Sequence, residues 1–376
     1  MKIKKNKLIL ISSEFPPLPG GIGNHAYNLA KYLTSSGYFL EVITPFRLKN
    51  IQNEINYDKQ LNFPVNRYIK KNTNYIISFF KLIKKSISSS NTTFIASGMV
   101  PLIICGFLKL FFKKSKIILI AHGLDINPKS FFFNIIVSIA IKRYDLIIAN
   151  SNYTSKIIQN NHRKESFVIN NGIDLDIFNE IVDLDYIKTP NLNKLKIVTV
   201  GTISDRKGQK NIIKIIPQLL EKYKNISYHI IGLPNGSKSI IKLAKQKNIL
   251  KNIFIHGVLS NSQMIKILKS SDVFMMLSEK TNDGDYEGFG IALIEANYLG
   301  LPAIGSRSCG LSDSIINGKN GFLVNPENDK EIIYAFDNII KEYKKFSTES
   351  RFHARKFIWG KVIMKYIKLL NKKGLI

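Results

Sequence analysis

The sequence predicts an α/β protein with two doubly wound, Rossmann-like domains, each a parallel sheet covered by helices on both faces. Short apolar runs of four to six residues alternate with longer segments of helical period. That alternation is typical of buried parallel strands and the helices that cross over between them. The chain has 376 residues, which is enough for two domains of ordinary size.

The expected strands form two groups, five before residue 165 and six after it. The first group is Lys7–Ser12, Leu40–Thr44, Thr93–Ala96, Lys116–Ala121 and Leu146–Ala149. The second group is Lys196–Val200, Ser227–Gly232, Ile253–Gly257, Val273–Leu277, Pro302–Gly305 and Gly321–Val324. Helical period marks Ile22–Ser35, Phe131–Lys142 and Arg351–Leu370. The polar stretch Asp183–Lys194, which contains a proline, is the expected linker.

The charge balance favours an anionic partner. The chain has 55 Lys and Arg against 27 Asp and Glu, a net charge of +28. The excess is greatest in residues 1–160, with 22 basic and 6 acidic residues. A compositional bias toward Lys, Ile and Asn is the alternative explanation. No arginine-rich arm or zinc finger accompanies the charge, so a membrane surface is favoured over nucleic acid, which is not expected as a partner.

Cysteine and histidine usage restricts the function classes further. Cys105 and Cys309, far apart in the chain, exclude a disulfide scaffold and a Cys-rich zinc module. The six histidines include no H-E-x-x-H or comparable ligand pair, so no metal site is expected. This usage predicts a reducing compartment, and we expect a cytoplasmic protein.

Two apolar stretches, residues 94–112 and 131–141, leave alternatives open. Both suit buried helices of an α/β domain, and both lie beside lysines, as in helices that contact lipid headgroups. The first is nearly long enough to span a bilayer but contains Pro101 and Lys109. A membrane span is the least favoured of the three interpretations.

Three motifs follow expected strands, where parallel sheets gather their functional side chains. Pro19–Gly23 opens a helix, and its glycines could bring backbone N–H groups to a phosphate. His122–Asp125 ends another strand. Val200–Gly208 presents Arg206 and Lys207, two adjacent cations that could hold a diphosphate. The first and third motifs are also compatible with ordinary turns, and His122 is also compatible with a structural histidine.

The fourth motif, Glu287–Ala296, places two carboxylates eight residues apart around a glycine-rich helix start. A helix that begins near Phe289 offers its first N–H groups to a phosphate. Glu287 and Glu295 would accept hydrogen bonds from sugar hydroxyls.

Together these segments resemble the family 4 retaining glycosyltransferases, which have the GT-B fold. The resemblance covers some 310 residues and keeps the family's order: EFPPLPGGIG (14–23), HGLD (122–125), ANSNYT (149–154), NNGID (170–174), VGTISDRKG (200–208), GVLS (257–260), EGFGIALIEA (287–296), LPAIG (301–305) and NGKNGFLVNPEN (317–328). It implies two domains that face a cleft, residues 1–172 and 173–354. It also implies a C-terminal helix, about 355–376, that crosses back to the first domain.

The resemblance implies a nucleotide-sugar donor, a UDP- or GDP-sugar, bound mostly by the second domain. Arg206 and Lys207 would neutralise its diphosphate beside Gly201, so that neither a metal ion nor another cofactor is required. Gly20 and Gly21 would offer backbone N–H groups to the same phosphates from the first domain.

Further donor contacts carry over to matching positions. Gly290 and Ile291 would hold the diphosphate through their N–H groups. Glu287 and the backbone of Gly288–Phe289 would bind the donor sugar. Glu295 would hold the ribose, and the backbone of Val258 would contact the base.

On the acceptor side, His122 would face the donor sugar and Asp125 could help to place substrate. The implied reaction is front-face transfer to a saccharide or lipid-linked acceptor in bacterial cell-surface polysaccharide or lipopolysaccharide synthesis. With the basic first domain, this suggests peripheral contact with an anionic membrane, at the cytoplasmic face of the inner membrane.

Some features depart from the family pattern. Many members have Arg directly after the strand glycine, where this chain has Thr202. The acidic loop Thr281–Tyr286, with Asp283 and Asp285, either touches the donor sugar or is simply solvated. A nucleotide-sugar epimerase or hydrolase, or a non-catalytic subunit of the same fold, remains the alternative.

Overall fold

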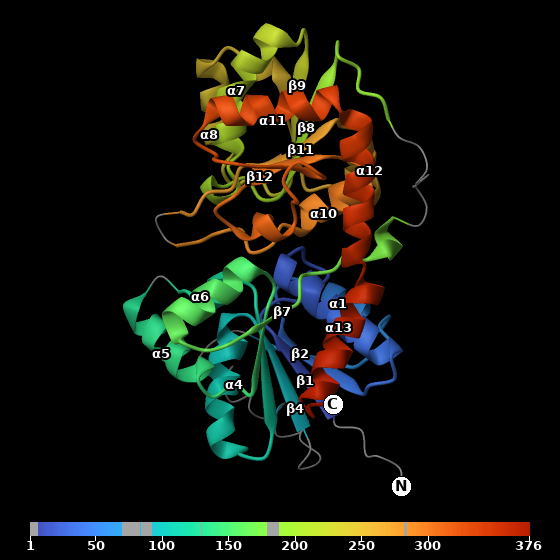
Figure 1. Ribbon diagram of the computed structural model, residues 1–376. Helices are drawn as coiled ribbons and strands as arrows, with labels where there is room; N and C mark the ends of the chain where they lie inside the picture. Colours follow the sequence, from blue (N-terminus) through green and yellow to red (C-terminus); the bar gives the residue numbers. More distant parts are fainter. Residues whose placement is uncertain (1–6, 70–82, 84–91, 129, 179–187, 282–283) are drawn as a thin grey trace. The chain divides into compact units, whose positions relative to one another are not determined.

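The computed structural model describes residues 7–69, 83, 92–128, 130–178, 188–281 and 284–376. It divides into two compact units, shown in Figure 1, and each is built on one parallel sheet. Unit 1 comprises residues 1–172 and 359–376, and unit 2 comprises residues 173–358. The predicted fold class, two Rossmann-like α/β domains, is confirmed.

The unit 1 sheet has seven parallel strands in the order β3-β2-β1-β4-β5-β6-β7. Its strands are β1 (Lys7–Ser12), β2 (Leu40–Pro45), β3 (Val65–Tyr68), β4 (Thr92–Ser97), β5 (Lys116–Ala121), β6 (Leu146–Ala149) and β7 (Phe167–Val168). The two edge strands, β3 and β7, were not predicted. The segment VNRY of β3 has two adjacent polar residues, Asn66 and Arg67, and β7 has only two residues, so neither gives an apolar run.

Helices cover both faces of this sheet, which explains why its central strands are continuously apolar. The described helices are α1 (Gly21–Ser35), α2 (Ile51–Asp58), α4 (Met99–Phe111), α5 (Phe131–Ile141), α6 (Asn152–His162) and α13 (Trp359–Lys372). Leu8 and Leu10 of β1 belong to a core that includes α1 and α13. Ile9 and Ile11 alternate with them and join a core that includes α4 and α5.

The C-terminal helix α13 packs against α1, with Trp359 and Tyr366 buried in the unit 1 core. The predicted single helix over Arg351–Leu370 is wrong. Helix α12 (Tyr343–Ala354) ends before a short turn, and α13 begins at Trp359. Between them Ile358 is extended and pairs with Ile173, so this backbone is used for a bridge rather than a helix.

The unit 2 sheet has six parallel strands in the order β10-β9-β8-β11-β12-β13. Its strands are β8 (Leu195–Val200), β9 (Ile226–Ile231), β10 (Ile253–Gly257), β11 (Val273–Met276), β12 (Ala303–Ser306) and β13 (Gly321–Val324). Its described helices are α7 (Gln209–Lys222), α8 (Ser237–Gln246), α9 (Asn261–Ser270), α10 (Ile291–Tyr298), α11 (Asp329–Lys341) and α12. All six strands fall where the sequence predicted them, within one or two residues.

The apolar stretches at residues 94–112 and 131–141 fold into β4 with α4, and into α5. In the part of the chain that the structure describes, no helix has both the length and the hydropathy to cross a membrane. Residues 183–187 of the expected linker lie outside the described residues, and residues 188–194 form no helix or strand.

Candidate functional site

The turn between β8 and α7 presents the two predicted cations. Strand β8 leads through Gly201 into a single 3-10 turn, Asp205–Lys207, and then into α7. Gly208 has φ 68°, and a Cβ there would collide with the carbonyl of Leu277. A glycine is therefore required at this position, because it lets the turn lie directly against the end of β11.

Arg206 and Lys207 converge on one carboxylate, that of Glu287. Nη1 of Arg206 and Nζ of Lys207 each lie 2.6 Å from Oε2 of Glu287. The Arg206 Nε also lies 3.1 Å from Oδ2 of Asp285, in the acidic loop before Glu287. Side-chain exposure is 25% for Arg206, 12% for Lys207 and 11% for Glu287, so solvent screens these pairs only weakly.

These contacts determine the charge of Glu287. Burial raises the pKa of its carboxyl, but the charges of Lys207 and Arg206, and their hydrogen bonds, outweigh burial and lower the pKa to about 2. Glu287 is therefore ionised at every physiological pH. Burial raises the pKa of the neighbouring Asp285 carboxyl, and the charge of Arg206 opposes that rise.

Glu287 also fixes the start of α10. Its Oε1 accepts a hydrogen bond from the N–H of Gly290, which is in the left-handed region at φ 83° and precedes the first helical residue. Among the described residues no side chain caps α10, and the first N–H groups of a helix have no partner within it. The Ile291 and Ala292 N–H groups thus begin an uncapped helix beside Arg206 and Lys207.

The backbone of Gly288–Phe289, rather than the Phe289 side chain, is what this segment can offer a ligand. The Phe289 ring is 2% exposed and packs against Phe357, with the ring centroids 5.5 Å apart. Gly310 passes so close to the Gly288 carbonyl that a Cβ at residue 310 would collide with it. The Gly288–Phe289 segment is therefore tightly packed against Phe357 and Gly310.

Glu295, the second carboxylate of the motif, has a different environment. It is half-buried in α10, and its carboxylate forms no hydrogen bond or ion pair with any residue that the structure describes. Burial raises the pKa of its carboxyl to about 7. Two carboxylates that look alike in sequence thus differ in charge near neutral pH, because only Glu287 contacts cations.

Val258 follows β10 and is 57% exposed. It comes directly after Gly257, which has φ 70°, and after His256. Nε2 of His256 lies 2.9 Å from Nδ1 of His229 on β9. Burial, with the charge of His256, lowers the pKa of His229 to about 4, so His229 is neutral at physiological pH.

In unit 1, His122 lies at the end of β5. Its Nε2 is 2.9 Å from the Ser97 hydroxyl, at the end of the neighbouring strand β4. Asp125 accepts hydrogen bonds from the N–H groups of His122 and Gly123 at 2.8–3.1 Å. Burial lowers the pKa of His122, so its imidazole is neutral at pH 7, and Asp125, only 3% exposed, holds the turn that carries it.

The sequence analysis missed His25, which lies on α1 beside His122. The two ring centroids are 5.1 Å apart. Nε2 of His25 lies 3.0 Å from the Tyr366 hydroxyl, and its Nδ1 is buried with no hydrogen-bond partner among the described residues. Burial, with the nearby His122, lowers its pKa far below the usual range. Its position just after the glycine loop was the available signal.

The glycine loop begins α1, with Gly20 preceding the helix and Gly21 as its first residue. The Glu14 carboxylate occupies the space that a Cβ on Gly20 would need, whereas the space beside Gly21 is open. No side chain caps α1 either. Gly21 is therefore on the same helix as His25, about one turn before it, and Gly20 immediately precedes that helix.

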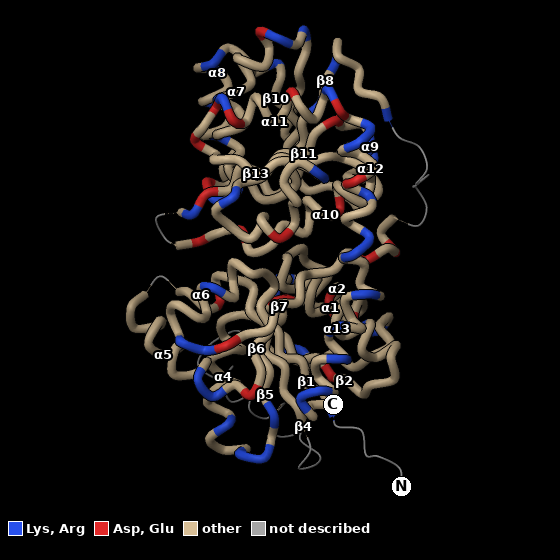
Figure 2. The backbone as a smooth tube through the Cα atoms, viewed as in Figure 1, with Lys and Arg blue, Asp and Glu red and all other residues tan. Residues whose placement is uncertain are grey.

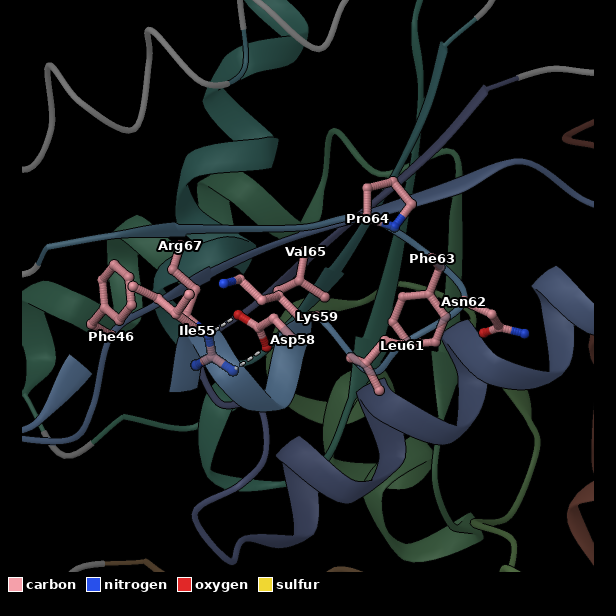
Figure 3. Close-up of a pocket in the computed structure, with 10 residues that line it drawn as sticks. All are labelled: Phe46, Ile55, Asp58, Lys59, Leu61, Asn62, Phe63, Pro64, Val65 and Arg67. Carbon is pink, nitrogen blue, oxygen red and sulfur yellow. Dashed lines mark hydrogen bonds and ion pairs between the residues drawn. The ribbon is translucent and has the colours of Figure 1, made fainter. Parts of the chain in front are cut away.

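Unit 1 also has a depression of about 600 Å³ beside α2 and β3, shown in Figure 3. Its lining includes Arg67, whose side chain is 1% exposed and pairs with Glu54 at 2.5 Å and Asp58 at 2.7 Å. The guanidinium is thus already neutralised by protein groups. None of the predicted site residues lines this depression.

Comparison with known families assigns both halves of the chain. The family described as glycosyl transferases group 1 matches residues 185–356, and the family described as Glycosyltransferase Family 4 matches residues 19–177. The first match contains Arg206, Lys207, Glu287 and Glu295, and the second contains Gly20 and His122.

Individual relatives agree with this assignment. An uncharacterized glycosyltransferase of Methanocaldococcus jannaschii is 26% identical, over 98% of this chain and 99% of its own. WcaL of Escherichia coli K12, a candidate colanic acid biosynthesis glycosyltransferase, is 27% identical over 57% of this chain and 53% of its own. The structure of Anabaena HepE in complex with UDP and glucose superimposes with a TM-score of 0.76, at 16% identity, over 98% of this chain and 100% of HepE.

Proposed function

The chain belongs to glycosyltransferase family 4, and we propose that it transfers a sugar from a UDP- or GDP-sugar with retention of anomeric configuration and without a metal ion. The observation that carries the proposal is the pair Arg206 and Lys207, both held on Glu287 beside the open start of α10. Two cations and a helix N-terminus together suit a diphosphate.

In the proposed reaction the bond between the sugar C1 and the diphosphate oxygen breaks. The acceptor hydroxyl attacks C1 from the same face, and its proton passes to the departing diphosphate. Arg206 and Lys207 stabilise the negative charge that develops on that group, with the N–H groups of Gly290 and Ile291. In the structure the two cations and the Gly290 N–H are held together on Glu287, so the diphosphate would replace that carboxylate as it binds.

The two glutamates take different tasks in this proposal. When a diphosphate engages Arg206 and Lys207, the Glu287 carboxylate can turn to the donor sugar hydroxyls, with the backbone of Gly288–Phe289. Glu295 has no partner among the described residues, so it can accept hydrogen bonds from the ribose hydroxyls. The exposed Val258 backbone contacts the base.

In unit 1 the neutral His122 offers a ring nitrogen to a bound sugar, and Asp125 keeps the imidazole in place. The uncapped start of α1 at Gly20 and Gly21 offers backbone N–H groups to a phosphate. Both roles are proposals that rest on the chain's similarity to its family.

The acceptor we propose is a saccharide or lipid-linked saccharide of bacterial cell-surface polysaccharide or lipopolysaccharide synthesis. The similarity to WcaL supports a surface polysaccharide, and the HepE complex supports a uridine nucleotide. We place this reaction at the cytoplasmic face of the inner membrane, where a lipid-linked acceptor and a nucleotide sugar can meet.

A thermal-shift screen against UDP, GDP, ADP and CMP, with magnesium or with EDTA, tests the donor site. A ligand that binds only the folded protein at ~100-fold its Kd adds about 3 kcal/mol to the free energy of unfolding. We expect a shift with one nucleoside diphosphate, equal in magnesium and EDTA, that Lys207→Ala reduces by half or more. Lys210→Ala is the matched control, because Lys210 is near the same turn but pairs with the exposed Asp205.

Product analysis tests the reaction itself. Incubation of the identified donor sugar with a saccharide acceptor should give a glycoside with the donor's anomeric configuration, measured by NMR coupling constants. Hydrolysis or epimerisation of the donor that needs no acceptor would instead assign the chain to the epimerase or hydrolase class. Binding without any turnover would assign it to non-catalytic subunits.

A further inference from the structure

Helix α5 of unit 1 exposes a row of large apolar side chains. Phe131 is 80% exposed and Phe132 is 67% exposed, and Phe133, Ile135 and Ile139 are each more than 40% exposed. Phe131, Ile135 and Ile139 are four residues apart and therefore lie along one side of the helix. Large apolar side chains that are exposed next to one another, unlike single scattered ones, mark an interaction site.

The opposite side of α5 is apolar as well. Val137, Ala140 and Ile141 are fully buried in the unit 1 core. The helix contains no charged residue at all, FFFNIIVSIAI. A helix at the protein–water boundary ordinarily has a polar outer side, so the outer side of α5 is suited to a less polar environment than water.

The apolar surface has a counterpart on α4, which packs beside α5. A Cβ on Gly106 of α4 would collide with Ala140 of α5, which shows how closely the two helices approach. At its C-terminal end α4 exposes Leu110 by 51% and Phe111 by 77%. We call the exposed apolar residues of the two helices the α4–α5 face: Leu110, Phe111, Phe131, Phe132, Phe133, Ile135 and Ile139.

Basic residues border this face with almost no acidic ones. Residues 99–145 contain seven Lys and Arg and two acidic residues, Asp125, which is buried, and Asp145, which is exposed and pairs with Lys109 at 2.7 Å. Lys113 and Lys114 lie two and three residues after α4, Lys142 directly follows α5, and all three are exposed. Figure 2 shows blue segments at the ends of both helices.

We propose that the α4–α5 face docks on an anionic phospholipid bilayer, with its phenylalanines among the acyl chains and headgroups. The inference deepens the proposed function and rests on it, because a lipid-linked acceptor requires an enzyme at a membrane. Charge complementarity favours an anionic bilayer over a second copy of this chain as the partner of the face. Two copies of the face would bring their lysines together, and like charges oppose such a contact.

The mode of contact is interfacial rather than spanning. Helix α5 has 11 residues, a length of about 16 Å, whereas a bilayer core is about 30 Å thick. The apolar side chains enter the headgroup boundary while the lysines stay among anionic headgroups. Because α5 begins nine residues after His122, this contact would also hold the His122 turn near the membrane surface.

Co-sedimentation of the full chain with vesicles tests the proposal. The vesicles are phosphatidylcholine alone or with about one-third phosphatidylglycerol, at low and high salt. We expect binding to the anionic vesicles only, weakened by salt and reduced at least about tenfold by Phe131→Ser with Phe132→Ser. Phe352→Ser is the matched control, because Phe352 is 61% exposed on α12 of unit 2 beside Lys356.

A second pair of variants tests the cations. Lys113→Ala with Lys114→Ala should weaken binding to anionic vesicles about 30-fold, at about 1 kcal/mol for each cation near the surface. Lys238→Ala with Lys242→Ala, which removes two exposed lysines of α8, should leave it unchanged. Phe132→Trp adds a depth reporter to a chain whose one tryptophan, Trp359, is buried, and its emission should shift to the blue on anionic vesicles.

Several results would overturn the proposal. One is a wild-type chain that does not bind anionic vesicles. Another is vesicle binding that is unchanged in the Phe131→Ser, Phe132→Ser variant. A dimer that Phe131→Ser with Phe132→Ser dissociates would assign the face to a second copy. The nucleoside-diphosphate thermal shift should persist in all these variants, so loss of membrane binding is distinguished from failure of the donor site.

Discussion

Glu287→Gln tests whether Arg206 and Lys207 act as counterions for a buried carboxylate. The variant keeps the shape of the side chain and removes its charge. A pKa of about 2, against 4.5 for an unperturbed glutamate, corresponds to about 3 kcal/mol of folding free energy. A loss of folding free energy of similar size is expected when one partner of a buried ion pair is removed. We therefore expect the variant to lose about 3 kcal/mol at pH 7.

The pH dependence of this loss has a defined sign. The pKa of Glu287 is lower in the folded chain, so its stabilisation is complete above the unfolded pKa near 4.5 and is lost as the pH falls toward 2. The difference between wild type and variant should be constant from pH 7 to 5.5. At pH 4 it should be smaller by about 1 kcal/mol.

Urea unfolding followed by circular dichroism at pH 7, 5.5 and 4 measures the loss of unfolding free energy and its dependence on pH. Glu342→Gln is the matched control, because Glu342 pairs with Lys345 at 2.7 Å but is exposed, and we expect no measurable change. A loss below about 1 kcal/mol at pH 7 would refute the reasoning, and so would a loss that stays the same at pH 4.

Three further predictions concern unit 2. Lys207→Met should weaken nucleoside-diphosphate binding about 10- to 100-fold by calorimetry, whereas Lys210→Met should not; equal effects would remove Lys207 from the donor site. UDP or GDP affinity should fall as the pH drops below about 7, where Glu295 protonates, and a Glu295→Gln variant that keeps this dependence would exclude Glu295 as its source. Gly208→Ala should destabilise unit 2 by more than about 2 kcal/mol in urea, since its Cβ meets the Leu277 carbonyl. Gly257 has a similar φ but open space beside it, so Gly257→Ala should lower the free energy of unfolding by only about 1 kcal/mol. Equal losses in the two variants would show that the approach of Gly208 to the Leu277 carbonyl is unimportant.

Much of the fold could be predicted from the sequence because its central strands are buried on both faces and therefore appear as apolar runs. Edge strands lack that signal, and β3, with Asn66 and Arg67 in its four residues, was missed for this reason. The break at Ile358 was missed because a bridge to Ile173 causes it, and pairing across 185 residues leaves no local pattern.

The site shows the same division between local and long-range information. Arg206 and Lys207 were recognisable because they lie on a turn after a strand, and Glu287 because it precedes a glycine-rich helix start. The contact of both cations with one carboxylate oxygen of Glu287 could not be predicted, since Lys207 and Glu287 are 80 residues apart in the chain. His25 was missed because its contact with Tyr366 joins α1 to α13, 341 residues away.

The different pKa values of the two glutamates follow from these long-range contacts. Burial alone would raise the pKa of both carboxyls, and for Glu295 it does. For Glu287 the two cations reverse the effect, so Arg206 and Lys207 have a counterion before any ligand arrives. In the proposed reaction the donor diphosphate takes over as that counterion, and an exchange of one anion for another avoids leaving two partly buried cations unpaired. The Glu287 carboxylate must then find new donors, and the sugar hydroxyls would supply them.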